Sequence, residues 1–461
     1  MPTKNSQSIQ QKEPICALAT ASGKGALAIV RLSGKGALDL ATQITQQALP
    51  VRQACYTSFF NNGEIIDQGL AIYFQAPASF TGEDVVEFHC HGNPLIAELL
   101  LKTLCSLGAR LATAGEFSLR AFLNNKIDLA QAEAIADLIN STTEQGARTA
   151  TRSLQGAFSE RIQEALTQLV QMRMHIEAHL DFPDEEIDRQ QTKQLQSKLN
   201  DTDEFLDQLL QQAKLGERLQ TGATVAIAGR PNAGKSSLLN VLAQSDVAIV
   251  TEIPGTTRDP LSADIEIRGM PVRLIDTAGL RETKDVVEAK GIERAQQALE
   301  QADVILWVID INDKDTQNIP YALDKNKVIF VYNKIDLQNE TQQNLSARIS
   351  EHVYISAKDS SGTDELIQRL SEKLLSEKLS GAENIQEQSD SPFLARSRHI
   401  IALQQAQKNI QQAQLRITSS QELELAAEDL RLAQQNLGEI TGEFTPDDLL
   451  GKIFSEFCIG K

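Results

Sequence analysis

Hydrophobic and polar positions alternate over short segments in the first part of the chain. Alternating segments lie at 26–32, 69–74 and 85–90, and an apolar stretch with helical character follows at 94–107. A period of two bounded by turn residues indicates half-buried strands. We therefore predict an α+β domain over residues 1–120.

From about residue 121, apolar positions recur at three- and four-residue steps. Leu129, Ala132, Ala136 and Ile139 follow this spacing, which returns near the C-terminus. Such a period predicts amphipathic helices. The region between, residues 222–378, instead alternates apolar strand-like runs with helical segments. That alternation is typical of a doubly wound parallel sheet.

These patterns predict a multidomain fold with α+β and α/β parts. The α/β domain is inserted between the two halves of one discontinuous helical domain. The predicted boundaries are 1–120 for the α+β domain, 121–221 for the first helical half, 222–378 for the α/β domain and 379–461 for the second helical half.

The net charge restricts how the chain could contact nucleic acid. It has 461 residues and a formal net charge of −18, whereas phosphate binding normally uses a basic surface. Residues 1–120 are neutral, with nine Lys and Arg against nine Asp and Glu. Composition alone predicts no RNA binding, so any RNA contact would need a local patch, this neutral region or a partner.

Cysteine usage and hydropathy indicate the compartment. The five cysteines are widely scattered, which argues against a disulfide framework and for a reducing compartment. No run approaches the ~18 apolar residues that would span a bilayer. The first fourteen residues are polar and lack the apolar core of a secretory signal. We expect a cytoplasmic protein.

Residues 229–236, GRPNAGKS, match the phosphate-binding pattern G-x-x-x-x-G-K-S/T. The match follows an apolar run at 225–228 and precedes a helical segment at 237–242, which is the strand–loop–helix context that the pattern requires. In such a loop, backbone N–H groups turn toward the phosphates. Lys235 would reach the β- and γ-phosphate oxygens, and the Ser236 hydroxyl could bind Mg²⁺.

Three further motifs follow in the order expected of a guanine-nucleotide-binding domain: DTAG at 276–279, NKID at 333–336 and SAK at 356–358. Each comes after an apolar strand, and open α/β sheets bind ligands at the carboxyl ends of their strands. Asp276 can hold Mg²⁺ through water. The Asp336 carboxylate can accept from both donors on guanine's edge and would stay unpaired beside adenine. The sequence therefore predicts a GTP-specific, Ras-like G domain.

The switch loops predict an unusual route to hydrolysis. Thr257 is the predicted switch threonine that senses the γ-phosphate and completes the Mg²⁺ shell. Leu280 stands where Ras-like proteins carry the glutamine that orients the attacking water, and leucine cannot take that role. A monovalent cation held by Asn232 and the carbonyls of residues 251–255 could supply positive charge. Polar candidates for orienting water are Arg281, Glu282, Asp285 and Glu288.

The chain resembles the MnmE (TrmE) family of tRNA-modification GTPases over essentially its whole length. The motifs GRPNAGKSS and GTTRD are shared with several GTPase families. The segments more specific to this family are FTGEDVVEFHCHG, AFLNNKIDLAQAEAIADLI, LRLAQQNLGEITGEF and the terminal CIGK. One departure is Asn93, which stands where the family usually carries a second glycine.

The resemblance implies a GTPase that takes part in tRNA modification. Members of the family add a carboxymethylaminomethyl-type group at carbon 5 of the wobble uridine of certain tRNAs. They act with an FAD-dependent partner, MnmG (GidA), in a heterotetramer or larger complex. The resemblance also implies potassium-activated GTP hydrolysis by G domains paired across a homodimer. The N-terminal domain is expected to mediate dimerisation and to bind 5-formyl- or methylene-tetrahydrofolate.

Motif matching to the family assigns the catalytic, metal and folate positions. Potassium contacts fall on Asn232, Thr251, Ile253 and Thr256. Magnesium contacts fall on Ser236 and Thr257. Folate contacts fall on Arg31, Glu87, Lys126 and Lys461. The catalytic positions are Lys235, Glu288 as the water-activating carboxylate, and Cys458 as a functional thiol. For Cys458, retention for packing near the terminus is the alternative.

The motifs and the resemblance together give the predicted nucleotide contacts. They are Asn232, Ala233, Gly234, Lys235, Ser236, Ser237, Thr251, Thr256, Thr257, Asp276, Thr277, Ala278, Gly279, Asn333, Lys334, Asp336, Ser356, Ala357 and Lys358.

Two other functions are compatible with parts of the sequence. A ribosome-assembly GTPase would share the phosphate-loop and switch motifs, but would carry an RNA-binding domain and no folate site. A thiol-redox protein regulated by GTP would depend on Cys458.

Two histidine pairs resemble metal ligands, but other roles fit them better. His89 and His91 share one face of a predicted strand, and Cys90 between them takes the other face. His175 and His179 stand at i and i+4 of a predicted helix with no evident third ligand. We therefore expect these histidines to serve packing or solvation.

Overall fold

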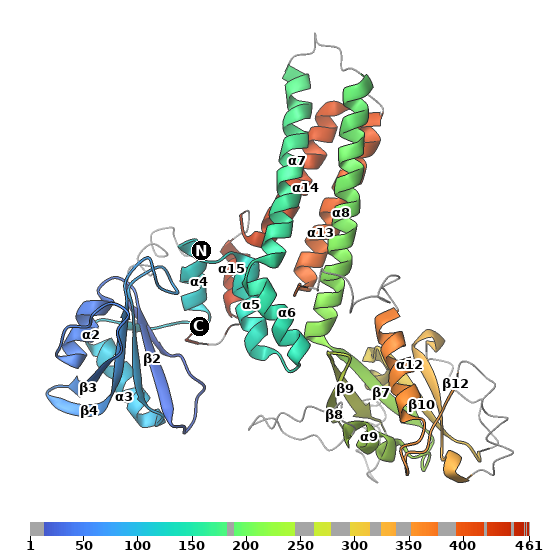
Figure 1. Ribbon diagram of the computed structural model, residues 1–461, viewed down its shortest axis with the longest axis horizontal. Helices are drawn as coiled ribbons and strands as arrows, with labels where there is room; N and C mark the ends of the chain where they lie inside the picture. Colours follow the sequence, from blue (N-terminus) through green and yellow to red (C-terminus); the bar gives the residue numbers. More distant parts are fainter. Residues whose placement is uncertain are drawn as a thin grey trace. The chain divides into compact units, whose positions relative to one another are not determined.

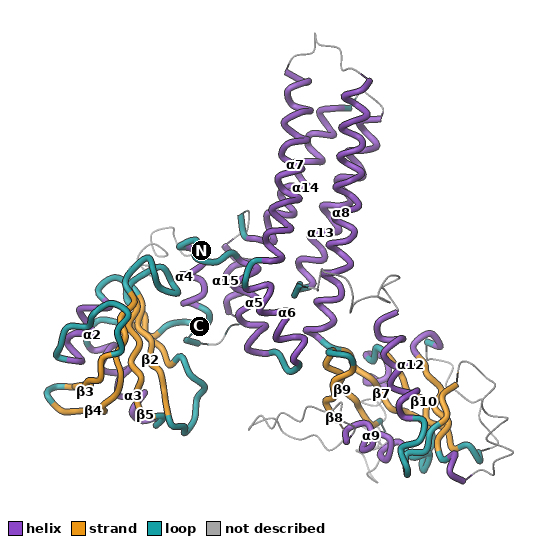
Figure 2. Tube along the Cα trace, in the orientation of Figure 1, coloured by secondary structure: helices purple, strands orange, loops and turns teal. Residues whose placement is uncertain are grey.

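The computed structural model describes residues 13–181, 189–244, 262–277, 296–313, 324–337, 352–376, 393–418, 422–443, 447–455, 457 and 459–460. The chain forms two compact units. The first comprises Met1–Ala136, Ser153–Thr202 and Gln405–Lys461, and the second comprises Asp137–Arg152 and Asp203–Gln404. Figure 1 labels the elements, and Figure 2 distinguishes helices, strands and loops.

The N-terminal part of the first unit contains a mixed sheet, which within the described residues has the strand order β3-β4-β5-β2-β1-β6. Neighbouring strands pair antiparallel except for β1 and β6, which are parallel. The strands are β1 (Ile15–Leu18), β2 (Leu27–Ser33), β3 (Cys55–Asn61), β4 (Glu64–Phe74), β5 (Val85–His91) and β6 (Arg110–Leu111).

Two helices, α2 (Ala37–Thr45) and α3 (Pro94–Ser106), pack against this sheet. Buried Ile44 and Leu104 from the helices join Phe88 from β5 in one apolar core. The predicted α+β domain is confirmed. Its strands alternate because one face meets these helices.

Asn93 has a structural role at the start of α3. Its backbone is extended, with φ −106°, and its side chain accepts a hydrogen bond from Leu95 N at 3.0 Å. Pro94 occupies the first helical turn. Asparagine is a preferred N-cap and proline a preferred first helical residue. Asn93 therefore fits this position, because the backbone does not adopt the positive φ that would favour glycine.

Helices from both ends of the inserted region form one helical domain, as predicted. α7 and α14 run side by side in Figure 1, and Arg173 Nη1 donates to Gln434 Oε1 at 2.9 Å between them. The helices are α4 (Glu116–Leu123), α5 (Leu129–Asn140), α6 (Glu144–Leu154), α7 (Ala157–Asp181), α8 (Arg189–Thr221), α13 (Ser397–Thr418), α14 (Leu423–Thr441) and α15 (Asp447–Ser455). Within the described ranges, no helix is long and apolar enough to cross a membrane.

The second unit contains another mixed sheet, whose described strands follow the order β12-β11-β10-β7-β9-β8. The strands are β7 (Ala223–Gly229), β8 (Ser262–Ile267), β9 (Met270–Asp276), β10 (Val304–Asp310), β11 (Val328–Asn333) and β12 (His352–Tyr354). The described helices after β7 and β12 are α9 (Lys235–Gln244) and α12 (Thr363–Ser376), and short 3-10 turns span Lys325–Lys327 and Ile335–Leu337.

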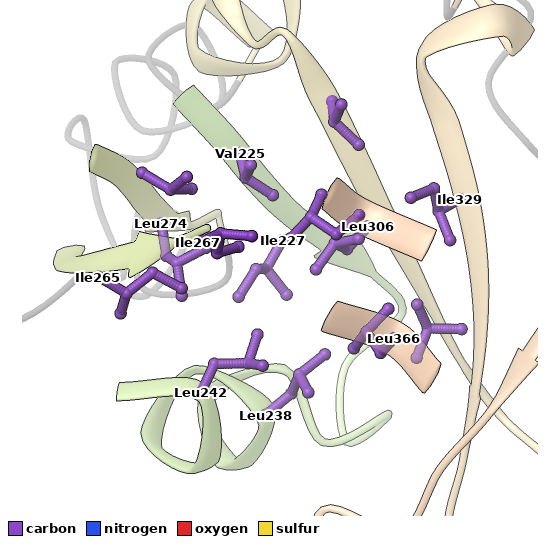
Figure 3. Close-up of a cluster of buried hydrophobic side chains, with 14 of the residues drawn as sticks. Val225, Ile227, Leu238, Leu242, Ile265, Ile267, Leu274, Leu306, Ile329 and Leu366 are labelled. Carbon is purple, nitrogen blue, oxygen red and sulfur yellow. The ribbon is translucent and has the colours of Figure 1, made fainter. Parts of the chain in front are cut away.

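Figure 3 shows how α9 and α12 cover one face of this sheet. Leu238 and Leu242 of α9 point toward Ile227 of the central strand, and Leu366 of α12 lies near Leu306. All five side chains are buried. The predicted doubly wound α/β domain is confirmed. A second buried cluster includes Ala226, Ala228 and Ile305, so both faces of the central strands are apolar and the strands are nearly continuous apolar runs.

The sheet differs from the predicted parallel arrangement at one edge, because β8 pairs antiparallel with β9. A two-residue turn joins them, with φ values of 49° at Arg268 and 84° at Gly269. Positive φ at both central residues is the geometry of a tight hairpin. Ile265 and Ile267 face the core from this short strand. Asp264 and Glu266 alternate with these isoleucines, so β8 lacks the nearly continuous apolar sequence of the central strands.

Candidate functional site

The predicted phosphate loop lies between β7 and α9, and its two glycines are required by close contacts. Gly229 has φ 143°, and an added Cβ would lie 2.2 Å from Val308 O. Gly234 has φ 96°, and an added Cβ would lie 2.2 Å from Asn333 Nδ2. Left-handed backbone and contacts this short both exclude a side chain. The geometry of the loop therefore requires both glycines of the sequence motif.

Three polar side chains meet at the start of α9. Lys235 Nζ donates to Arg230 O at 2.7 Å, and Lys235 is only 6% exposed. Ser236 Oγ donates to Asp276 Oδ2 at 2.6 Å. The phosphate loop and the end of β9 thus bring a hydroxyl and a carboxylate together. Oxygen ligands of these types suit Mg²⁺.

The NKID segment contacts both the phosphate loop and the SAK segment. Asn333 Nδ2 donates to Ala233 O at 2.9 Å, and Asn333 Oδ1 accepts from Ala357 N at 2.9 Å. Ser356 Oγ donates to Asp336 Oδ1 at 2.9 Å. Asn333 and Ser356 are almost fully buried. Segments predicted separately as phosphate-binding and base-binding are therefore held in direct contact.

Two further contacts complete this edge of the sheet. Thr277 Oγ1 donates to Ile227 O at 2.9 Å, which ties the DTAG segment to β7. Lys334 Nζ donates to Asn232 O at 2.8 Å and to Asp310 Oδ2 at 2.7 Å. The four predicted motifs thus lie at the carboxyl ends of β7, β9, β11 and β12, where open α/β sheets bind ligands.

The sequence did not predict Asp310 or the nearby ion pair of Arg230 with Asp313. Arg230 Nη1 donates to Asp313 Oδ2 at 3.0 Å. Burial raises the pKa of Asp310, but hydrogen bonds from Lys334 and Asn312 outweigh it and lower that pKa. A signal was present, because Asp310 ends β10 just as the recognised motifs end their strands.

Part of the predicted site lies outside the described residues. This applies to the loop at 251–259, the segment after Thr277, position 458 and the last residue of the given sequence. The predicted residues concerned are Thr251, Ile253, Thr256, Thr257, Ala278, Gly279, Leu280, Arg281, Glu282, Asp285, Glu288, Cys458 and Lys461. Ser237 and Lys358 lie within the described residues, on α9 and directly after Ala357.

The predicted folate residues Arg31 and Glu87 form a pair on the N-terminal sheet. They stand opposite each other in the register of β2 and β5, and Arg31 Nε donates to Glu87 Oε1 at 2.9 Å. The guanidinium lies 5.7 Å from the ring centroid of Phe80 and 5.8 Å from that of Phe117. A cation and a carboxylate between aromatic rings can bind a flat, polar heterocycle.

Other parts of the chain approach this pair. Arg31 Nη1 donates to Gly460 O at 3.5 Å, next to predicted Lys461. Lys126 Nζ donates to Pro77 O at 3.0 Å, in the loop that also carries Phe80. Arg31 and Glu87 are therefore in direct contact. Lys126 instead contacts the loop that carries Phe80, and Phe80 lies against Arg31.

The histidines have separate neighbours. His89 Nε2 lies 3.5 Å from Glu87 Oε2, and His91 Nδ1 lies 2.8 Å from Asp67 Oδ1. Cys90 is buried on the other face of β5. His175 and His179 contact each other, with ring centroids 4.8 Å apart. Over the described part of the chain, no group of three His, Cys, Asp or Glu side chains is placed to hold a metal.

Two family models match the chain. The model of the N-terminus of the GTP-binding protein TrmE matches residues 14–126, and the model of the MnmE helical domain matches residues 129–458. Era from Aquifex aeolicus, a solved structure, is 31% identical, with 41% of this chain and 66% of that chain covered and a TM-score of 0.25. The G domain of T. maritima FeoB is 26% identical, with 33% and 98% covered and a TM-score of 0.24.

Curated relatives match almost the full length. The tRNA modification GTPase MnmE of Saccharophagus degradans is 48% identical over 465 residues, covering 98% of this chain and 99% of the relative. The protein of the same name from Pseudomonas syringae pv. syringae is 47% identical over 460 residues, with the same coverage. On this identity and coverage, the chain belongs to the MnmE family of tRNA modification GTPases.

Proposed function

We propose that the chain binds and hydrolyses GTP and couples this reaction to modification of the wobble uridine of certain tRNAs. The observation that carries the proposal is the direct contact of Asn333, in the NKID segment, with both the phosphate loop and the SAK segment. Family membership supplies the tRNA substrate class. It also favours this function over ribosome assembly, because a TrmE-type domain occupies residues 14–126.

Asp336 would select guanine. Its Oδ1 accepts from Ser356 Oγ at 2.9 Å, and a carboxylate keeps further lone pairs for guanine N1–H and the exocyclic amine. Adenine lacks these donors and would leave the carboxylate desolvated and unpaired. Asn333 would hold this loop against the phosphate loop, and Ala357 and Lys358 would brace the base.

The phosphates would lie over the N-terminus of α9. Lys235, which now donates to Arg230 O, would turn to the β- and γ-phosphate oxygens. Ser236 Oγ would bind Mg²⁺ directly, with Thr257, while Asp276 would act through water. The Ser236–Asp276 contact of 2.6 Å supports that assignment. Bound Mg²⁺ would neutralise charge developing on the transferred phosphoryl group.

A potassium ion would supply positive charge where other GTPases use an arginine finger. The contacts we propose for it are Asn232, Thr251, Ile253 and Thr256, in G domains paired across a homodimer. Asn232 has φ 64°, and its carbonyl is held by Lys334, so its loop has a defined conformation. Glu288 would orient the attacking water in place of a glutamine at Leu280.

The N-terminal domain would bind a tetrahydrofolate derivative through Arg31, Glu87, Lys126 and Lys461, and would mediate dimerisation. The carboxylate suits a pterin edge, and the cations suit the glutamate tail. We propose that the chain acts in the cytoplasm with the FAD-dependent partner MnmG, in a heterotetramer or larger complex. Cys458 would serve as a thiol near this site.

Two experiments test the proposal at different levels. Deleting the coding sequence and analysing tRNA nucleosides by mass spectrometry should show loss of the modified wobble uridine. An unchanged nucleoside profile would refute the role in modification. This result would leave the nucleotide chemistry to be judged by the second experiment.

The second experiment compares GTP hydrolysis by the full chain in KCl and in NaCl at equal ionic strength. We expect about tenfold or greater stimulation by potassium, in the range of other electrostatic contributions to catalysis. Asn232→Gly keeps the positive φ and should remove most of this stimulation, whereas Asn326→Ala, in an exposed turn, should keep it. Equal rates of the unaltered chain in both salts would refute the cation mechanism.

A further inference from the structure

Asp310 ends β10 directly beside the predicted base-binding loop. In the parallel register of β10 and β11, Asp310 stands opposite Asn333, and Ile311 N donates to Asn333 O at 3.0 Å. The next residue on β11's side is Lys334. Chain topology therefore places the Asp310 carboxylate next to the NKID segment, although none of the recognised motifs includes it.

The Asp310 carboxylate is itself fixed from two sides. Its Oδ1 accepts from Asn312 N at 3.0 Å, and its Oδ2 accepts from Lys334 Nζ at 2.7 Å. The side chains of Asp310 and Lys334 are 28% and 32% exposed, so solvent screens the pair only partly. A charge-assisted hydrogen bond of this length is stronger than one between neutral groups.

Lys334 connects the base-binding loop to the phosphate loop. Its ammonium donates to Asn232 O at 2.8 Å as well as to Asp310. Its backbone has φ 70°, in the left-handed region that residues other than glycine rarely adopt. A lysine stem loses rotamer entropy when it is held in one place. The Asp310 carboxylate gives the ammonium a second fixed partner besides Asn232 O.

We propose that Asp310 is a positioning residue for guanine-nucleotide binding, which it serves by holding Lys334 across the two loops. The inference rests on the proposed GTP site. Asp310 itself would not touch the nucleotide. A ligand that contacts Asp336 through its base and Lys235 through its phosphates needs both loops in place. Ordering them beforehand lowers the cost of binding.

This role predicts a particular split in the kinetics. Asp310→Asn is isosteric and removes the charge, so GDP binding should weaken about five- to tenfold, as expected for one charge-assisted hydrogen bond. The KM for GTP should rise by a similar factor, while kcat at saturating GTP should stay within about twofold. Asp310→Glu should recover part of the affinity because it restores the carboxylate.

A double-mutant cycle separates positioning from a general structural role. In the full chain, GDP affinity would be measured by titration calorimetry for Asp310→Asn, Lys334→Met and the double variant. If Asp310 acts through Lys334, its substitution should add nothing in the Lys334→Met background. Asp264→Asn is the matched control, because Asp264 also forms an ion pair, with Arg273, but lies on the exposed edge strand β8. It should leave GDP affinity and kcat unchanged.

Several outcomes would overturn the inference. Unchanged GDP affinity in Asp310→Asn would do so, as would additive effects in the double variant or a loss confined to kcat. A fall in thermal unfolding temperature together with failure of Asp310→Glu to recover affinity would assign Asp310 a structural role instead. If the unaltered chain did not prefer GDP to ADP, the proposed GTP site would fail as well. If the unaltered chain preferred GDP to ADP but Asp310→Asn left the GDP affinity unchanged, only the positioning role would be refuted.

Discussion

Asn333 donates its side-chain amide to the carbonyl oxygen of Ala233 at 2.9 Å, although the two residues lie 100 positions apart in the chain. The same amide nitrogen is 2.2 Å from the position that a Cβ on Gly234 would occupy. The proposed base-binding loop and the phosphate loop are therefore held together by the Asn333 side chain, and the sequence of each loop limits which residues the other can carry.

The glycine at this contact should be indispensable. Gly234→Ala would place a methyl group against Asn333 Nδ2 and force alanine to φ 96°. We expect a loss of about 1 kcal/mol or more in stability from the backbone conformation, and loss of measurable GDP binding by calorimetry. Gly451→Ala, where no atom lies within 4 Å of the added Cβ, should bind GDP normally. Normal binding by Gly234→Ala would contradict this constraint.

Asp336 should decide which base is accepted. Asp336→Asn exchanges an acceptor for a donor, so the pairing with guanine is lost and pairing with xanthine, which carries a carbonyl there, becomes favourable. GDP affinity should fall by about a hundredfold or more, while xanthosine diphosphate should bind more tightly than to the unaltered chain. Titration calorimetry measures both ligands. Asp364→Asn, in the first turn of α12, serves as the control and should change neither affinity.

Glu87 should contribute to folate binding through its pairing with Arg31. Glu87→Gln keeps the shape but removes the charge that holds Arg31 at 2.9 Å. We expect affinity for 5-formyl-tetrahydrofolate to fall about tenfold, the size of one hydrogen bond to a charged group. Exposed Glu64→Gln on the neighbouring strand should bind as the unaltered chain does. Equal affinities for the two variants would argue against a folate site on this face.

Glu116 should make the N-terminal domain sensitive to acid. Burial raises the pKa of this carboxyl, but hydrogen bonds from Arg110 and Thr113 N and the charge of Arg120 outweigh it, lowering the pKa from 4.5 to about 2. The ionised form therefore stabilises the fold above pH 4.5, and this stabilisation, on the order of 3 kcal/mol, is lost as pH falls toward 2.

Glu116→Gln should remove that dependence. The variant should be less stable than the unaltered chain at pH 7, and the difference should shrink as the pH is lowered from 4.5. Hydrogen exchange of peptides covering α4, corrected at each pH for intrinsic exchange rates, measures the local stability. Glu64→Gln, at an exposed position of β4, should leave the exchange of these α4 peptides unchanged at every pH. A constant difference across pH would contradict the assigned pKa.

The local sequence pattern predicted the G domain well because its functional motifs lie at the ends of apolar strands. Each motif follows an apolar strand, so Ser236, Asp276 and Asn333 could be placed together before their contacts were known. The edge strand β8 was not predicted, since its alternation of charged and apolar residues is short and its pairing depends on a tight turn at Gly269.

Contacts set by long-range register could not be predicted from local pattern. Arg31 and Glu87 meet because β2 and β5 pair antiparallel across 56 positions, and a shift of one residue would send them to opposite faces. Gly460 reaches Arg31 across 429 positions. Resemblance named Arg31 and Glu87, but only the structure showed that they contact each other.

The most direct test of the account is equilibrium binding of GDP and ADP to the purified full chain in the presence of Mg²⁺. If Asp336 and the two loops form a guanine site, GDP should bind at least about a thousandfold more tightly than ADP, because adenine would leave a desolvated carboxylate without a partner. Equal affinity for the two nucleotides would contradict the assignment of this edge of the sheet as a guanine-nucleotide site.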